Sequence, residues 1–150
     1  MSEADRDLSE GRRRQILTSF ERQGLLRTMG ARIVALEKGR CLVELPFSEL
    51  VSQQHGFFHG GSVGALADTA GGYAAMTMMP DATDVLTLEY KINFLRPAAG
   101  QIVIAEGEVL RAGRSVTVTR VSVHAVYGDR RVLCAAMQQS VVPAPSHREP

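Results

Sequence analysis

Apolar and polar residues alternate most strictly over residues 86–94. Leucine, tyrosine, isoleucine and phenylalanine occupy the even positions of this stretch, and threonine, glutamate, lysine and asparagine occupy the odd ones. A period of two is typical of a β-strand that packs one face on a core and exposes the other. We therefore expect a strand here, with its five apolar side chains together on the buried face.

The rest of the chain predicts two helices and five more strands. One helix, with apolar positions between Ile16 and Leu26, precedes the strands, and a longer one covers residues 61–79. Consecutive strands joined by short turns indicate an antiparallel sheet, and one helix must cover its apolar face. We therefore expect an α+β fold. The five further strands cover residues 31–36, 40–45, 101–110, 115–127 and 131–142.

A single domain is expected over residues 10–142. A chain of 150 residues is long enough for one core, and this segment contains no internal repeat or linker. Residues 1–9 are polar and predict a flexible N-terminus. Residues 143–150 contain three prolines and predict a disordered C-terminal tail.

The charge balance excludes several classes of protein. Lysine and arginine number 17 against 16 acidic residues, so a dedicated nucleic-acid binder is not expected. No apolar run approaches the ~18 residues of a membrane span, and the polar, acidic first residues do not resemble a signal peptide. Cys41 and Cys134 show no disulfide or zinc spacing. We expect a cytoplasmic protein, with residues 12–14, three arginines, on a solvated helix face rather than in a nucleic-acid or membrane patch.

The long helix carries two different faces. One is an apolar stripe suited to a sheet, and the other consists of very small residues around a single carboxylate, Asp68. Glycine inside a helix costs about 1 kcal/mol relative to alanine, so the small stripe predicts a close approach by another helix or by a ligand. Asp68 is either a surface or capping residue, or a catalytic base or nucleophile. The small stripe consists of Gly61, Gly64, Ala65, Asp68, Gly72 and Ala75.

The sequence His59-Gly60-Gly61 lies where this helix should begin. The first N–H groups of a helix lack intrahelical partners and lie at the positive end of its dipole. The glycines either form an oxyanion hole or simply permit a tight turn. His59 and His55 have no third ligand at metal-site spacing, and the role of His55 stays open. No serine-hydrolase, P-loop or dinucleotide motif is present in the sequence.

Together these residues resemble a known family. The sequence His59-Gly60-Gly61, the helical stretch 65–70 (Ala-Leu-Ala-Asp-Thr-Ala) and the stretch 92–98 (Ile-Asn-Phe-Leu-Arg-Pro-Ala) are similar to hotdog-fold acyl-CoA thioesterases. The resemblance is to the phenylacetate-degradation-type branch of the 4-hydroxybenzoyl-CoA thioesterase superfamily and covers roughly residues 25–142. It implies a hotdog fold, with an antiparallel sheet wrapped around one long central helix. It also implies a homodimer as the minimal unit and a homotetramer as the assembly.

The resemblance assigns roles to five residues around the helix. By analogy Asp68 is the catalytic carboxylate, and the Gly60 N–H, in the motif that begins with His59, polarises the thioester carbonyl. Gln53 would position the carboxylate or the attacking water, and Thr87 would help to hold that water. Since Gly60 and Asp68 are eight residues apart, or about 12 Å along a helix, one chain cannot supply both to one carbonyl. Each site is therefore expected to be shared between two chains.

The substrate contacts implied by the resemblance lie elsewhere. Arg111, Gly113, Arg114 and Ser115 match the turn that contacts coenzyme A, and two guanidiniums and a glycine also suit a phosphorylated ligand. The same residues fit an ordinary hairpin turn. Phe58 could line the acyl pocket, although core packing explains it equally well.

The expected activity is hydrolysis of an acyl-CoA, either aryl-acetyl or short/medium-chain, to the free acid and coenzyme A. Neither a metal nor a redox cofactor is expected, and Asp68 acts either as general base or through a mixed anhydride. Two alternatives remain on the same fold. One is a non-catalytic acyl-CoA-binding or sensing module, and the other is a hydratase or dehydratase.

Overall fold

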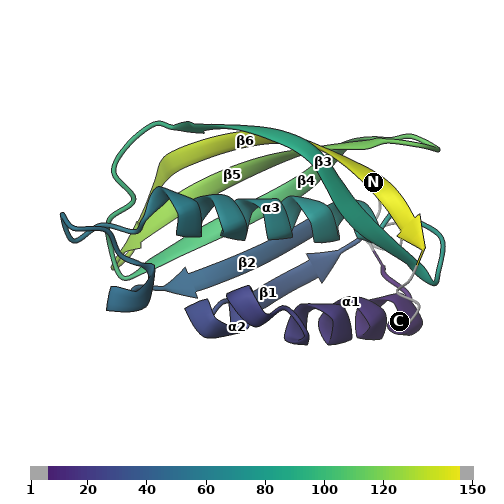
Figure 1. Ribbon diagram of the computed structural model, residues 1–150, viewed down its shortest axis with the longest axis horizontal. Coiled ribbons are helices and arrows are strands. Elements are labelled where there is room, and N and C mark those ends of the chain that lie inside the picture. Colours follow the sequence, from purple (N-terminus) through teal and green to yellow (C-terminus); the bar gives the residue numbers. More distant parts are fainter. Residues whose placement is uncertain (1–6, 146–150) are drawn as a thin grey trace.

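The computed structural model describes residues 7–145, which form one antiparallel sheet wrapped around a long helix (Figure 1). The strand order is β1-β2-β4-β5-β6-β3, and every neighbouring pair is antiparallel. This confirms the α+β architecture. The elements are α1 (Glu10–Glu21), α2 (Gly24–Met29), β1 (Arg32–Glu37), β2 (Arg40–Pro46), the short 3₁₀ helix η2 (Glu49–Val51), α3 (Gly60–Met76), β3 (Thr83–Phe94), β4 (Ile102–Ala112), β5 (Thr117–Tyr127) and β6 (Arg130–Pro145).

The core lies between α3 and the concave face of the sheet. Alternate residues of β2, β4 and β5 are buried, as a period of two requires, and they face the apolar stripe of α3. The strand β4 packs tightly on the helix at Gly107, where a Cβ would lie 2.4 Å from the carbonyl oxygen of Ala70. Within residues 7–145, no helix is long and apolar enough to cross a lipid bilayer.

The strand β3 contains a bulge that the alternating sequence did not predict. Thr87 pairs with Val141 of β6, whereas Glu89 pairs with Ser140, so Leu88 has no partner between them. Residues directly opposite each other in an antiparallel ladder point to the same face. Because the bulge inserts one extra residue, every side chain after it points to the opposite face from the one it would take in a regular strand.

The bulge divides the five apolar residues of β3 between two faces. Tyr90, Ile92 and Phe94 lie on the side of α3, while Leu86 and Leu88 lie on the outer side and are each 62% exposed. The prediction that all five share the buried face is therefore wrong. Since β3 is also an edge strand, the exposed side chains of Leu86 and Leu88 lie on the strand whose edge is open.

Side chains of β3 lie against α3 at Gly60 and at Gly64, which belongs to the small stripe. A Cβ at Gly60 would lie 3.2 Å from the Phe94 ring, and one at Gly64 would lie 3.6 Å from the Tyr90 hydroxyl. Within one chain the close approach is thus made by strand side chains rather than by another helix. The carboxylate of Asp68 faces the same strand.

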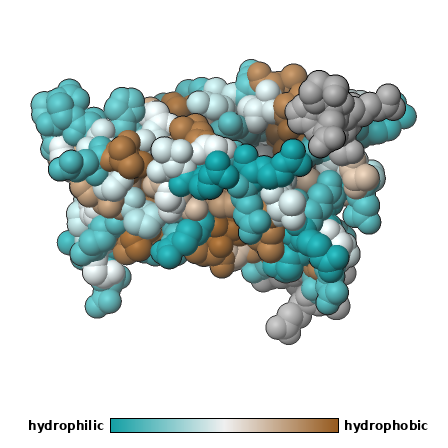
Figure 2. All heavy atoms as spheres, turned by 60° about the horizontal axis from the view of Figure 1, so that its bottom comes forward, coloured by the Kyte–Doolittle hydropathy of each residue, from teal (hydrophilic) through white to brown (hydrophobic). Residues whose placement is uncertain are grey.

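The N-terminal segment forms two helices, α1 and α2, rather than one. The prediction of a solvated arginine face is wrong for Arg12, which is 2% exposed and donates hydrogen bonds to the carbonyl oxygens of Met79 (2.6 Å), Thr83 (3.0 Å) and Pro80. These carbonyls lie in the segment that follows α3, and their oxygens satisfy donors of the buried guanidinium. Burial lowers the pKa of Arg12. Figure 2 looks onto the side of the molecule that carries α1 and α2, and shows hydrophobic patches separated by hydrophilic residues.

The C-terminal boundary differs from the prediction. Residues 143–145 belong to β6, with Pro143 opposite Val85, although they were expected in a disordered tail. β5 begins at Thr117, opposite Val141, so after Val141 the strand β6 has a neighbour on one side only. A proline, which cannot donate a hydrogen bond, is tolerated at such an edge. Residues 1–6 and 146–150 of the predicted termini lie outside the described residues.

Candidate active site

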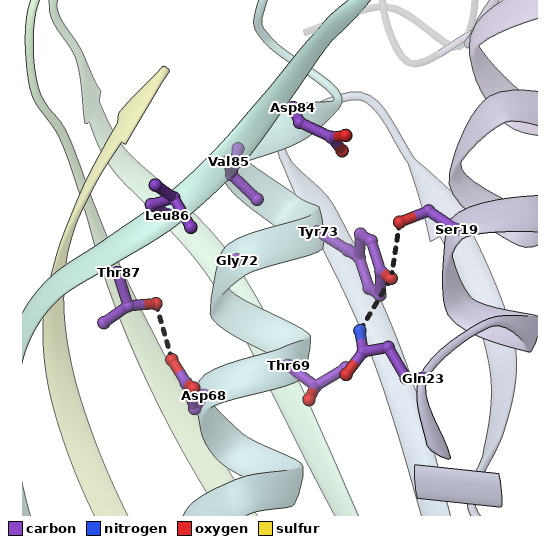
Figure 3. Close-up of a pocket in the computed structure, with 10 residues that line it drawn as sticks. All are labelled: Ser19, Gln23, Asp68, Thr69, Gly72, Tyr73, Asp84, Val85, Leu86 and Thr87. Atoms are coloured by element: carbon purple, nitrogen blue, oxygen red, sulfur yellow. Dashed lines mark hydrogen bonds between the residues drawn. The ribbon is translucent and has the colours of Figure 1, made fainter. Parts of the chain in front are cut away.

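Asp68 is held by hydrogen bonds to one of its two carboxylate oxygens. It lies midway along α3, and the Thr87 hydroxyl donates to its Oδ1 at 2.7 Å (Figure 3). Gln139 Nε2 donates to the same Oδ1 and lies 2.9 Å from Thr87 Oγ1. No hydrogen bond or ion pair to Oδ2 is found within residues 7–145. The carboxylate is therefore fixed by Oδ1 and free at Oδ2, as a base or nucleophile requires.

The bulge in β3 brings Thr87 to Asp68. In a regular strand Thr87 would share a face with Glu89 and Lys91, as the alternating sequence predicted. With the bulge, Thr87 lies on the α3 side together with Tyr90. Bulges often occur beside active sites, where they redirect a side chain.

Gln139 was missed by sequence reasoning. It is 1% exposed, on the face of β6 that points at α3. A signal was present, since every second residue of this strand is apolar at Ala135, Met137 and Val141, and Gln139 interrupts that series. A polar residue in a buried series indicates a hydrogen-bonding role.

A cavity of about 310 Å³ opens beside Asp68, between α1, α3 and β3 (Figure 3). Its wall contains a fixed polar group: Gln23 Nε2 donates to the Tyr73 hydroxyl at 2.7 Å, and this hydroxyl donates to Ser19 Oγ at 3.1 Å. Burial raises the pKa of Tyr73, so the phenol stays protonated. The lining residues are Ser19, Gln23, Asp68, Thr69, Gly72, Tyr73, Asp84, Val85, Leu86 and Thr87.

The N-terminus of α3 leaves the Gly60 N–H group available. His59 is the N-cap residue, and its Nδ1 accepts a hydrogen bond from the Gly61 N–H at 2.8 Å. The Gly60 N–H has no hydrogen-bond partner within the described part of the chain. This N–H lies at the positive end of the helix dipole and, because it is unpaired there, can donate to a ligand oxygen. His59 acts here as a cap.

Gln53 lies at the same end of α3 as Gly60, in the loop that leads into the helix. Its carbonyl accepts from the Gly56 N–H at 3.0 Å, and its side-chain Oε1 accepts from the His55 N–H. The structure therefore brings Gln53, His59 and Gly60 to one region. Asp68 is eight residues along α3 from Gly60, about 12 Å.

Phe58 occupies a core position in the same loop. It is 3% exposed and packs edge-on against Phe47, with the ring centroids 5.1 Å apart. In one chain it therefore offers almost no surface to a substrate.

The turn between β4 and β5 carries Arg111 and Arg114. Gly113 accounts for the turn itself, because a Cβ there would lie 2.5 Å from the carbonyl oxygen of Val116. Neither arginine forms an ion pair with another side chain in residues 7–145. Both are therefore available to an anion, as is Ser115 beside them.

This turn lies at the Asp68 end of the sheet. At the base of the turn, Ala112 pairs with Thr117, Thr117 pairs with Val141, and Val141 pairs with Thr87. Three strand spacings separate Ala112 from Thr87, which corresponds to roughly 14 Å. The predicted residues thus divide between two regions, one around Asp68 and the turn, and the other around Gly60.

Among residues 7–145, the histidine, cysteine and acidic side chains form no metal site, and the two thiols are buried. No cluster of three His, Cys, Asp or Glu side chains that could hold a metal ion occurs in residues 7–145. Cys41 and Cys134 are both buried and free, and burial raises the pKa of the Cys41 thiol to about 12. A thiol of this kind is a poor nucleophile at neutral pH.

Comparison with known proteins supplies a family context. The family model described as the thioesterase superfamily matches residues 55–131. The 1,4-dihydroxy-2-naphthoyl-CoA hydrolase of Listeria monocytogenes is 36% identical over 101 residues, which are 67% of this chain and 81% of that enzyme. A thioesterase family protein from Silicibacter pomeroyi superposes with a TM-score of 0.87 at 36% identity, over 89% of this chain and 98% of that one. A Bacillus halodurans protein solved with CoA superposes with a TM-score of 0.73 at 26% identity, over 91% of each chain.

Proposed function

The chain belongs to the thioesterase superfamily, and from that premise we propose that it hydrolyses acyl-CoA thioesters to a free acid and coenzyme A. The observation that carries the proposal is the carboxylate of Asp68, fixed through Oδ1 and free at Oδ2, beside a cavity. The Listeria relative is a 1,4-dihydroxy-2-naphthoyl-CoA hydrolase, and the Bacillus protein was solved with CoA. We further propose that it belongs to the phenylacetate-degradation-type branch and takes an aryl-acetyl or short/medium-chain acyl group into the cavity of about 310 Å³.

The proposed reaction uses the free carboxylate oxygen. Asp68 Oδ2 takes a proton from a water that attacks the thioester carbon, while the Gly60 N–H stabilises the oxyanion. A C–O bond forms, the C–S bond breaks, and the departing thiolate takes the proton back from Asp68. In the alternative route Oδ2 attacks the carbon directly, and the C–S bond breaks to release the thiolate. Water then hydrolyses the mixed anhydride to the free acid, its second proton goes to the thiolate, and the Asp68 carboxylate is restored. No metal or redox cofactor takes part in either route.

Two protomers together complete each proposed site. Gly60, His59 and Gln53 come from one protomer, and Asp68 and Thr87 come from its partner, related by a two-fold axis. The 12 Å between Gly60 and Asp68 within one helix requires this sharing. The open edge of β3 and its exposed leucines supply an apolar face for the second copy. We propose that two such dimers form a homotetramer.

Arg111 and Arg114 are proposed to bind the phosphates of coenzyme A, with Gly113 and Ser115 shaping the turn. Neither guanidinium has a carboxylate partner in the described part of the chain, so an anion meets no competing ion pair. Neither nucleic acid nor a membrane is a proposed partner. The proposed location is cytoplasmic, where the two buried cysteines would stay reduced.

Release of free thiol tests this function. The purified protein is incubated with aryl-acetyl, short-chain and medium-chain acyl-CoAs, and free CoA is measured with a thiol reagent. We expect Asp68-dependent release from at least one of these esters. Binding without release would support a sensor instead, and addition of water to an enoyl-CoA would support a hydratase.

A further inference from the structure

Gln139 is a polar side chain on the face of β6 that otherwise points the apolar side chains of Ala135, Met137 and Val141 at α3. It is almost fully buried, and its neighbours on the same face of β6, Met137 and Val141, are buried as well. Methionine or leucine would fill a similar volume without a polar group. An amide at such a position is stable only where its hydrogen bonds are made.

Both the oxygen and the nitrogen of the Gln139 side-chain amide form hydrogen bonds. Buried Thr119 donates from Oγ1 to Gln139 Oε1 at 3.1 Å. Nε2 lies 3.1 Å from the carbonyl oxygen of Asp68, within hydrogen-bond distance of its Oδ1, and 2.9 Å from Thr87 Oγ1. The reverse orientation would place Oε1 against the two Asp68 oxygens, which are both acceptors, so the hydrogen-bonding chemistry fixes the orientation.

The helix makes room for this amide at Gly71. A Cβ at Gly71 would lie 2.0 Å from Gln139 Oε1 and 2.8 Å from Thr119 Oγ1. Alanine is more favourable than glycine inside a helix, so local propensity does not explain the glycine. The buried amide and the missing side chain therefore belong to one arrangement.

We propose that Gln139 is a positioning residue that holds the carboxylate of Asp68 by one oxygen. The Thr87 hydroxyl has a single proton, which it donates to Oδ1, and Gln139 supplies the second donor. With two donors on Oδ1 the carboxylate cannot rotate freely, and Oδ2 remains the oxygen that reacts. The catalytic consequence rests on the proposed function, because a carboxylate held in one orientation accelerates a reaction only where the chemistry takes place.

The first test is Gln139→Met, which keeps the volume and removes the donor. We expect kcat to fall by roughly 10- to 100-fold while KM stays within about twofold, because the substrate does not touch Gln139. Gln138→Met is the matched control, since Gln138 directly precedes Gln139 on β6 and is exposed. It should leave both constants unchanged. A normal kcat in a folded Gln139→Met variant would overturn the proposal.

A double-mutant cycle separates positioning from general destabilisation. In an Asp68→Ala background, Gln139→Met should change the residual rate by less than about twofold, because the group that it holds is already gone. An equal proportional loss in both backgrounds would mean that Gln139 acts on the fold rather than through Asp68.

A readout without turnover keeps this inference independent of the proposed function. The side-chain amide signal of Gln139 in a ¹H–¹⁵N spectrum is assigned by its disappearance in Gln139→Met. It should move on Asp68→Ala, while the Gln138 signal stays in place. An unmoved signal would overturn the link between Gln139 and Asp68. A moved signal in a protein that hydrolyses no acyl-CoA would support the link and reject the proposed function.

Discussion

The hydroxyl of Thr87 donates a 2.7 Å hydrogen bond to Oδ1 of Asp68 across the gap between β3 and α3. The bulge at Leu88 puts Thr87 on the α3 side of the strand and Glu89 on the opposite side. The Thr87 hydroxyl can therefore donate to the Asp68 carboxylate. The hydroxyl proton is therefore committed to Asp68. Thr87 contributes to the site chiefly by orienting the carboxylate, and a lone pair of its oxygen remains for a water.

Replacing Asp68 with asparagine should remove most turnover and leave the fold intact. Asparagine has nearly the same shape and still accepts from Thr87 through its Oδ1, but it can neither take a proton nor attack a carbonyl. We expect kcat to fall by at least ~100-fold, with acyl-CoA binding largely retained. Steady-state kinetics and equilibrium binding measure the two effects separately. Near-normal kcat in a folded variant would exclude Asp68 as the catalytic carboxylate.

Replacing Arg111 and Arg114 together with alanine should affect coenzyme A binding rather than chemistry. The loss of two cations should raise KM and weaken its dependence on salt, with a smaller change in kcat. A truncated thioester without phosphates serves as the control substrate, since it should be almost insensitive to the change. Equal losses on both substrates would assign the arginines a structural role in the turn.

Gly71→Ala should destabilise the protein although alanine favours helix. The new Cβ would lie 2.0 Å from Gln139 Oε1, and forcing an extra carbon into a packed core costs about 1–3 kcal/mol. The helix gains back at most about 1 kcal/mol. Urea unfolding at one fixed protein concentration measures the difference.

The neighbouring Gly72→Ala is the matched control for this prediction. A Cβ at Gly72 would lie 3.8 Å from Val85, which is an ordinary contact, so this variant should be neutral or up to about 1 kcal/mol more stable. If Gly71→Ala were as stable as Gly72→Ala, Gln139 would not be packed against α3 as described.

The sequence allowed the elements to be predicted well, because their signals are local. Periods of two and 3.6 residues identified the six strands and the long helix, and the His59-Gly60-Gly61 sequence marked the start of α3. The bulge in β3 escaped prediction since alternation continues unbroken through Leu88, and no glycine marks the inserted residue. Which face a strand residue takes depends on its partner strand, and the sequence of β3 alone does not contain that register.

The contacts that escaped prediction link residues far apart in the chain. Arg12 is buried because its guanidinium reaches carbonyl oxygens about 70 residues later, beyond the end of α3. The Gln139 amide donates a hydrogen bond to Asp68, which lies 71 residues earlier in the chain. Nothing in the sequence around the arginines or around Gln139 indicates which distant residues they will hydrogen-bond to. In contrast, the carboxylate among small residues on α3 did identify Asp68 as a candidate.

A mixed dimer tests most directly whether the active site is shared between two protomers. One protomer carries Asp68→Ala and the other carries Gly60→Pro, which removes the proposed N–H donor at a position where a helix start tolerates proline. Each mutant homodimer should be nearly inactive. In a purified, dual-tagged heterodimer one site contains both changes and the other contains neither, so about half of the wild-type activity should return. If the heterodimer stays as inactive as the homodimers, Gly60 of one protomer does not act with Asp68 of its partner.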